Sequence, residues 1–226
     1  AVAGTAHLWD GRPMDDLTKR SIDEFLDAVA QRTPTPGGGS MAAAAGALAC
    51  ALARMVGAYS VGKNAEEGVR DRTEALVDQL RRVDEILRGL VTQDAVAYAA
   101  MSAAEKAARE NAAMKPTHQD AVLAAAAVPM ETAAAASQAL AIMDELKDFA
   151  NRHLLSDLGV AAVLAEAAAR AAWYMVTVNL PEVAHAATRT KLREGIDQTL
   201  QHCQSSARSI EGFVRGRLEN RETGSR

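Results

Sequence analysis

The chain has 226 residues, of which 49% are apolar and only 4% aromatic, and its formal net charge at pH 7 is −4. This length fits one domain with a sizeable core, and the acidic balance argues against the basic footprint of a nucleic-acid-binding domain. With no uninterrupted apolar run of membrane-spanning length and no secretion signal at the N-terminus, we expect a cytoplasmic protein with no membrane partner.

Alanine makes up much of the apolar content, and it fills little volume. Helices must therefore approach closely to bury it, which favours an all-α bundle of about six helices that dimerises through helix packing. Cys50 and Cys203 both fall in helical patterns, and without a secretory context we expect free thiols.

Residues 1–20 show no periodicity and are predicted to form an N-terminal arm. Ser21 and Glu24 have the spacing of a capping box and begin a short amphipathic helix to about residue 30. A Pro- and Gly-rich turn leads into an apolar helix from about Ser40 to Tyr59. Asn64 is placed to cap the next helix, a long one reaching about residue 113.

Pro116 ends that long helix, and a fourth helix is expected over residues 118–149, kinked or split by Pro129. A fifth helix runs from a cap at Ser156 or Asp157 to about residue 178. Pro181 opens a sixth helix to about residue 219. One helical domain over 21–219 is thus predicted between the arm and a polar tail at 220–226.

The turn Thr33-Pro-Thr-Pro-Gly-Gly-Gly-Ser40 is the most distinctive local motif. Glycine removes the Cβ and proline fixes φ, so backbone N–H groups at the start of the next helix could face an anionic ligand, with Ser40 as N-cap. The motif is neither a Walker loop nor GxGxxG. The alternative is a tight turn whose glycines let two helices touch.

Three charged residues are candidates for chemistry. Asp94 lies where the long helix becomes apolar, and burial there would raise its pKa toward the range useful for proton transfer; otherwise it is an exposed mid-helix residue. Asp157 is a site candidate or a plain N-cap, and Lys63 could meet an anion or lie on the surface. The five histidines lack metal-ligand spacing, so no metal site is predicted.

Several segments together resemble the formimidoyltetrahydrofolate cyclodeaminase / methenyltetrahydrofolate cyclohydrolase family. The Pro-Gly-Gly-Gly-Ser turn is followed by Asp94-Ala-Val-Ala-Tyr98, Ala127-Val-Pro-Met130, and Ser156-Asp-Leu-Gly leading to Val178-Asn-Leu180. The order and spacing of these segments agree with those of the family over roughly residues 21–215. The stretch Ser102–Met114 departs from the family pattern, so the resemblance assigns no substrate contact to that region.

The resemblance implies an all-α homodimer that binds a reduced folate, possibly polyglutamylated, with no cofactor beyond the tetrahydrofolate substrate. It places the acid/base carboxylate at Asp94, and pocket residues at Gly37, Gly38, Gly39, Ser40, Lys63 and Asp157. We expect Asp157 to meet the pterin, and the glycine N–H groups with Lys63 to meet the glutamate tail.

The implied activity is hydrolysis of 5,10-methenyltetrahydrofolate to 10-formyltetrahydrofolate, favoured because no transferase domain is attached in this chain. The alternatives are 5-formimidotetrahydrofolate cyclodeaminase, a catalytically silent folate-binding dimer, and an interaction module built on the long helix.

Overall fold

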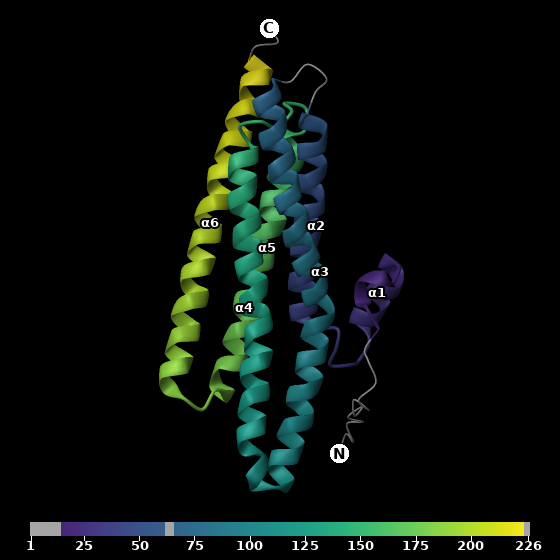
Figure 1. The fold of residues 1–226 in the computed structure, drawn as a ribbon, viewed down its shortest axis with the longest axis vertical. Coiled ribbons are helices and arrows are strands. Elements are labelled where there is room, and N and C mark those ends of the chain that lie inside the picture. Colours follow the sequence, from purple (N-terminus) through teal and green to yellow (C-terminus); the bar gives the residue numbers. More distant parts are fainter. Residues whose placement is uncertain (1–14, 62–65, 224–226) are drawn as a thin grey trace.

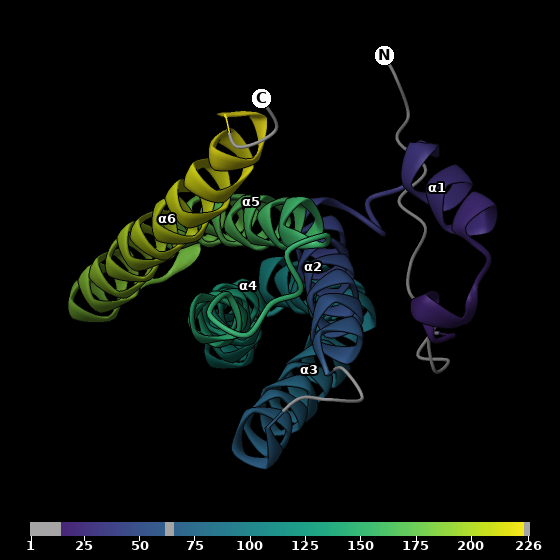
Figure 2. The same ribbon diagram turned by 90° about the horizontal axis from the view of Figure 1, so that it is seen from above.

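The computed structural model describes residues 15–61 and 66–223, which form six α-helices and three short 3₁₀ turns. The helices are α1 (Ile22–Ala30), α2 (Gly38–Ser60), α3 (Glu67–Glu110), α4 (Lys115–Leu146), α5 (Leu155–Asn179) and α6 (Ala186–Thr223). Helices α2 to α5 alternate in direction around one core, and α6 packs outside against α5 and α4 (Figures 1 and 2). The predicted all-α bundle with one long helix is confirmed.

Small residues let the core helices approach closely, as the alanine content predicts. A Cβ on Gly46 of α2 would lie 3.0 Å from Leu87 of α3 and 3.5 Å from the Cβ of Ala168 of α5. A Cβ on Gly57 would lie 2.4 Å from Val77. Because alanine and glycine fill this layer, the backbones meet where larger side chains would hold them apart.

Several helix boundaries differ from the sequence prediction. Pro129 does not split α4, which runs continuously from Lys115. Pro116 lies in the first turn of α4, where a missing N–H costs nothing, so this helix starts earlier than predicted. Pro181 belongs to a separate turn, Leu180–Glu182, and α6 begins after it at Ala186 and continues to Thr223. Asn64, the expected cap of α3, lies outside the described residues.

Residues 15–37 contact the bundle near Leu17 and join it again at the start of α2. The Leu17 side chain is buried, and its N–H donates to Thr92 Oγ1 of α3 at 2.9 Å. The capping box at Ser21 and Glu24 is present as predicted. Helix α1 lies beside the bundle, with Ile22 and Leu26 exposed (Figure 2). The loop after α1 then leads directly into the N-terminus of α2.

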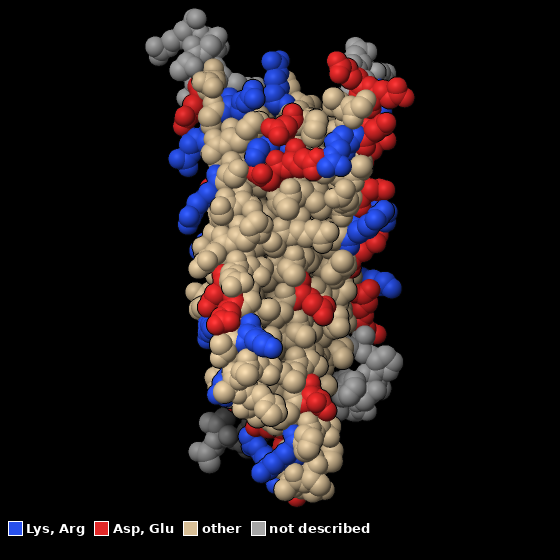
Figure 3. All heavy atoms as spheres, turned by 60° about the vertical axis from the view of Figure 1, so that its left-hand side comes forward, with Lys and Arg blue, Asp and Glu red and all other residues tan. Residues whose placement is uncertain are grey.

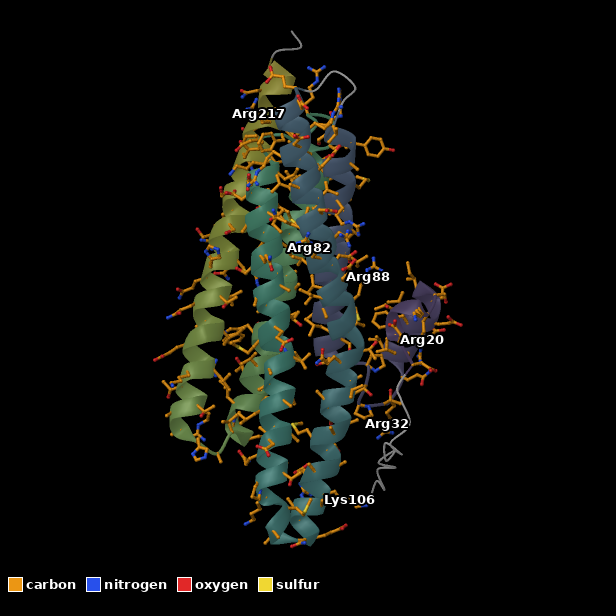
Figure 4. All side chains as sticks on the ribbon, in the orientation of Figure 1. Arg20, Arg32, Arg82, Arg88, Lys106 and Arg217 are labelled. Atoms are coloured by element: carbon orange, nitrogen blue, oxygen red, sulfur yellow. The ribbon has the colours of Figure 1, made fainter. Side chains whose placement is uncertain are left out.

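A buried carboxylate links α2 to α3 in the upper half of the bundle. Asp84 is 2% exposed, and its two oxygens accept from Arg54 Nη1 and Arg88 Nε, each at 2.8 Å. Figure 4 shows Arg88 on the side of the bundle where α1 lies. Asp84 thus holds two arginines in place at the surface, and they in turn compensate its burial.

The surface over α4 and α6 has few charges along its middle (Figure 3). Alanines occupy much of the exposed side of α4, among them Ala124, Ala127, Ala134 and Ala141. By length and composition alone, α2 and the stretch Leu155–Glu182 could cross a membrane, although neither is an uninterrupted apolar run. Core helices of a bundle share that property.

Candidate active site

Asp94 of α3 reaches across to the N-terminus of α2. Its Oδ2 accepts the backbone N–H of Ser40 at 2.8 Å and the Ser40 hydroxyl at 3.1 Å. The Ser40 side chain is fully buried, so its hydroxyl is directed to the carboxylate and not to solvent. Asp94 therefore acts as a cap on α2 supplied by a different helix.

This contact depends on the glycines of the turn. Helix α2 begins at Gly38 with Gly37 as a cap that offers no side-chain bond. A Cβ on Gly39 would lie 1.9 Å from Asp94 Oδ1, and one on Gly38 would lie 2.9 Å from Met175 Sδ of α5. Only residues without a side chain let α3 and α5 close onto the start of α2 in this way.

The surroundings of Asp94 act on its charge in opposite directions. Burial raises the pKa of the Asp94 carboxyl above its ordinary value, and the two hydrogen bonds from Ser40 oppose that rise. The positive end of α2 also favours the ionised form. The result is a carboxylate in a partly dry site that is suited to accept a proton and return it.

A cavity of about 170 Å³ opens in front of this carboxylate. Four helices and the loop before α2 contribute to its wall. The lining residues are Pro34, Thr35, Gly37, Gly38, Gly39, Asp94, Tyr98, Met101, Ala125, Met175, Val178 and Asn179. Ligand pockets usually reach several hundred Å³, so this cavity has room for one part of a larger ligand.

The structure brings together most of the predicted site residues. Gly37, Gly38 and Gly39 line the cavity with Asp94, as proposed from the motif. Ser40 lies behind Asp94 as the third residue of the helix, so the prediction that it is the N-cap was wrong. Because its N–H already bonds Asp94, this donor is not left for an external anion. Lys63 lies outside the described residues.

Asp157 is placed far from this cavity within one chain. It lies in the first turn of α5, whereas Met175 and Asn179 lie at the other end, about 27 Å and about 33 Å away at roughly 1.5 Å per residue. Leu154 is the N-cap of α5 and no side chain caps that end, so the alternative that Asp157 is a plain N-cap is wrong.

Sequence reasoning missed eight cavity residues as site candidates, five of which bear on the chemistry of the site. Tyr98 and Met101 follow Asp94 at i+4 and i+7, a helical spacing that places all three on one face and could have identified them. Met175 and Asn179 are close to Asp94 in space only because α5 runs back toward the start of α2. Ala125 has no side-chain signal at all.

Other parts of the described chain offer weaker sites. No group of three or more His, Cys, Asp or Glu within residues 15–61 and 66–223 is placed to hold a metal ion. A larger hollow of about 390 Å³ lies between α4 and the start of α6, where Asp120 is exposed. Asp94 is the acidic residue in these cavities whose carboxylate is both partly buried and held by hydrogen bonds.

Comparison with known proteins gives relatives of two kinds. The chain is 31% identical over 214 residues to the formimidoyltransferase-cyclodeaminase of Rattus norvegicus, covering 93% of this chain and 40% of the rat protein. It is also 31% identical over 183 residues to the methenyltetrahydrofolate cyclohydrolase of Methylorubrum extorquens, covering 78% of this chain and 88% of that protein. The chain thus spans about two fifths of the length of its mammalian relatives.

A solved structure agrees with this likeness along nearly its whole length. The crystal structure of formiminotetrahydrofolate cyclodeaminase from Thermotoga maritima matches with a TM-score of 0.81 and 28% identity, over 89% of this chain and 99% of that one. The family model described as formiminotransferase-cyclodeaminase matches residues 21–198. That range contains the glycine turn, Asp94 and Asn179, and the chain therefore belongs to the formiminotransferase-cyclodeaminase family.

Proposed function

We propose that this protein hydrolyses 5,10-methenyltetrahydrofolate to 10-formyltetrahydrofolate, with Asp94 as the general acid and base. The observation that supports this most directly is the partly buried Asp94 carboxylate, held by Ser40 at the wall of a cavity. The relative from Methylorubrum extorquens, most of whose length this chain covers, is named for this reaction.

The mechanism requires one group that moves a proton twice. Asp94 takes a proton from water as the water oxygen bonds to the carbon between N5 and N10. The neutral adduct then breaks its carbon–N5 bond, Asp94 returns the proton to N5, and the new hydroxyl releases its proton to solvent as it becomes the formyl oxygen. Proton transfer by a positioned carboxylate contributes roughly 10²–10⁴-fold to such reactions.

A second candidate is the cyclodeaminase reaction, because the mammalian relatives and the Thermotoga maritima structure are named for it. There N10 attacks the formimido carbon of 5-formimidotetrahydrofolate, and ammonia leaves. Asp94 would take the N10 proton and give a proton to the departing nitrogen. The same carboxylate serves both reactions, since both pass through a tetrahedral carbon between nitrogens.

The decay of the methenyltetrahydrofolate chromophore at neutral pH, in a buffer without amines, tests the proposal. We expect rapid decay with the wild type and a rate near background with Asp94→Asn, which keeps the size of the side chain. If the wild type does not exceed the spontaneous rate, the hydrolase proposal fails. The same assay with 5-formimidotetrahydrofolate then separates a deaminase from a silent folate binder, which thermal stabilisation by folates would reveal.

The glutamate tail of a folate, polyglutamylated or not, would extend beyond the small cavity. Arg32 follows α1 just before the Pro34 wall, and Lys106 lies on α3 just beyond Met101. Both are exposed and lie toward the lower end of the bundle (Figure 4). We therefore assign the tail carboxylates to Arg32 and Lys106, next to the cavity.

We also propose a cytoplasmic homodimer that forms through the outer faces of α2 and α5. These neighbouring helices expose apolar side chains, and Arg54 is the single charged residue between Gly38 and Ser60. The exposed residues include Leu48, Tyr59, Val160, Val163, Tyr174 and Val178. Asp157 would contact a folate in this cavity only from a second copy, and sedimentation of the wild type and of Leu48→Glu tests the interface.

A further inference from the structure

Pro129 leaves one backbone carbonyl of α4 without its usual partner, and that carbonyl belongs to a cavity residue. In an α-helix the N–H of residue 129 would bond the carbonyl of Ala125, but proline has no N–H. Ala125 is buried and lines the cavity beside Asp94. A buried carbonyl needs a donor, so its partner must come from outside the helix.

That donor is Asn179, at the C-terminal end of α5. Its Nδ2 donates to the Ala125 oxygen at 3.5 Å, a long contact. A carbonyl can only accept, so the amide nitrogen and not Oδ1 must face Ala125. The contact therefore sets which way the Asn179 amide points. One N–H of Nδ2 is used by Ala125, and the other N–H and Oδ1, which lie side by side on the amide, remain available for a ligand.

The Asn179 amide and the proposed catalytic carboxylate line the cavity from two different helices. Asn179 and Met175 come from α5, whereas Asp94, Tyr98 and Met101 come from α3. Methionine side chains on both walls suit contact with a flat aromatic ring, because the thioether is polarisable and adaptable. A ring seated between the walls has its edge available to the amide.

We propose that Asn179 is a specificity-determining residue that recognises the lactam edge of the substrate's pteridine ring, an inference that rests on the proposed function. Oδ1 accepts the ring N3–H, and the free N–H of Nδ2 donates to the ring carbonyl at position 4. This adjacent acceptor and donor match the lactam, whose donor and acceptor lie in the complementary order.

The orientation set by Ala125 then gives selectivity. A ring with an amino group at position 4 presents an acceptor at N3 and a donor at position 4, which is the reverse pattern. Binding it would require the Asn179 amide to flip, and the flip would bring Oδ1 against the Ala125 oxygen, two acceptors facing each other. Pro129 is therefore a positioning residue that acts through Ala125 and Asn179.

Folic acid and aminopterin test this, because they differ only in the oxo or amino group at position 4. Each is titrated as a competitor of methenyltetrahydrofolate turnover and, independently of turnover, by the shift of the thermal midpoint. We expect folic acid to bind the wild type at least about tenfold more tightly than aminopterin. Asn179→Ala should bring the ratio of the two dissociation constants near one by weakening the binding of folic acid.

Pro129→Ala is the sharper variant. It supplies an N–H to the Ala125 carbonyl, which then stays hydrogen-bonded when the Asn179 amide flips, so the flip costs less and the ratio should move toward one mainly through tighter binding of aminopterin. Combined with Asn179→Ala it should change the ratio no further. Pro116→Ala is the matched control, since Pro116 lies in the first turn of α4, where no N–H is needed, and it should keep the wild-type ratio.

A wild type that binds both compounds equally, or neither of them, overturns the inference, and so does an Asn179→Ala variant that keeps the wild-type ratio. If Pro129→Ala keeps the ratio while Asn179→Ala abolishes it, the role of Pro129 is refuted. Selective folic acid binding by an enzyme that turns over neither folate substrate would refute the proposed function and leave this assignment standing. Circular dichroism of each variant establishes that it is folded.

Discussion

Replacing Gly39 by alanine should separate Asp94 from Ser40. The added Cβ would lie 1.9 Å from Asp94 Oδ1 and 2.4 Å from its Cγ, so the carboxylate must move. Moving it breaks the two hydrogen bonds that Ser40 donates. The substitution thus displaces the proposed catalytic group without changing its chemical identity.

The cost follows from these contacts. Each hydrogen bond to a charged group contributes about 1.5–3 kcal/mol, and alanine in a helix regains about 1 kcal/mol over glycine. The free energy of unfolding should therefore fall by about 2–5 kcal/mol, toward the lower end if the displaced carboxylate reaches water. Loss of positioned acid/base catalysis should lower kcat by at least roughly 100-fold.

Urea denaturation measures the first quantity, and methenyltetrahydrofolate decay measures the second. Gly89→Ala is the matched control, because Gly89 is an exposed helical glycine with no atom within 4 Å of an added Cβ. It should raise the free energy of unfolding by up to about 1 kcal/mol and leave kcat unchanged. A Gly39→Ala enzyme with wild-type kcat would refute the view that Asp94 must sit against the start of α2.

Ser40→Ala removes a hydrogen bond that lowers the pKa of Asp94, so this pKa should rise further. The acidic limb of the kcat/KM profile should then shift to higher pH, and an unmoved limb would show that another group titrates there. Because burial raises the pKa of Asp94 in the folded protein, ionising this carboxyl destabilises the fold. The free energy of unfolding should therefore drop as the pH rises from 3.8, the ordinary Asp value, through the pKa of Asp94 in the folded protein. Asp94→Asn should lack this pH dependence. Asp84→Ala should cost about 1.5–3 kcal/mol of stability, because it removes the charged hydrogen bonds from Arg54 and Arg88, which are exposed enough to turn to water, while kcat of the folded enzyme stays the same; a loss below about 1 kcal/mol in urea denaturation would contradict this. Arg32→Ala and Lys106→Ala should each raise KM for a triglutamyl substrate more than for a monoglutamate and leave kcat intact, so equal KM changes for both substrates would remove these residues from the tail site.

The sequence determined local structure well where the signal is local. The capping box at Ser21 and Glu24 predicts the start of α1, because both partners lie within one helical turn. The prolines were harder to interpret. Whether Pro116 ends one helix or starts the next depends on what the flanking segments pack against, and Pro129 is tolerated inside α4 although it removes a hydrogen bond.

Asp94 and the glycine turn could be picked out from the sequence, since an acidic residue in an alanine-rich helix and three consecutive glycines are unusual by themselves. Their relationship was decided only by the tertiary structure. Gly39 and Asp94 are far apart in the chain and meet because α2 and α3 run in opposite directions at close distance. The same packing separates Asp157 from the cavity along α5 and brings Asn179 to the carbonyl that Pro129 leaves free, because the direction of a helix, and not the type of residue on it, decides which end reaches the site.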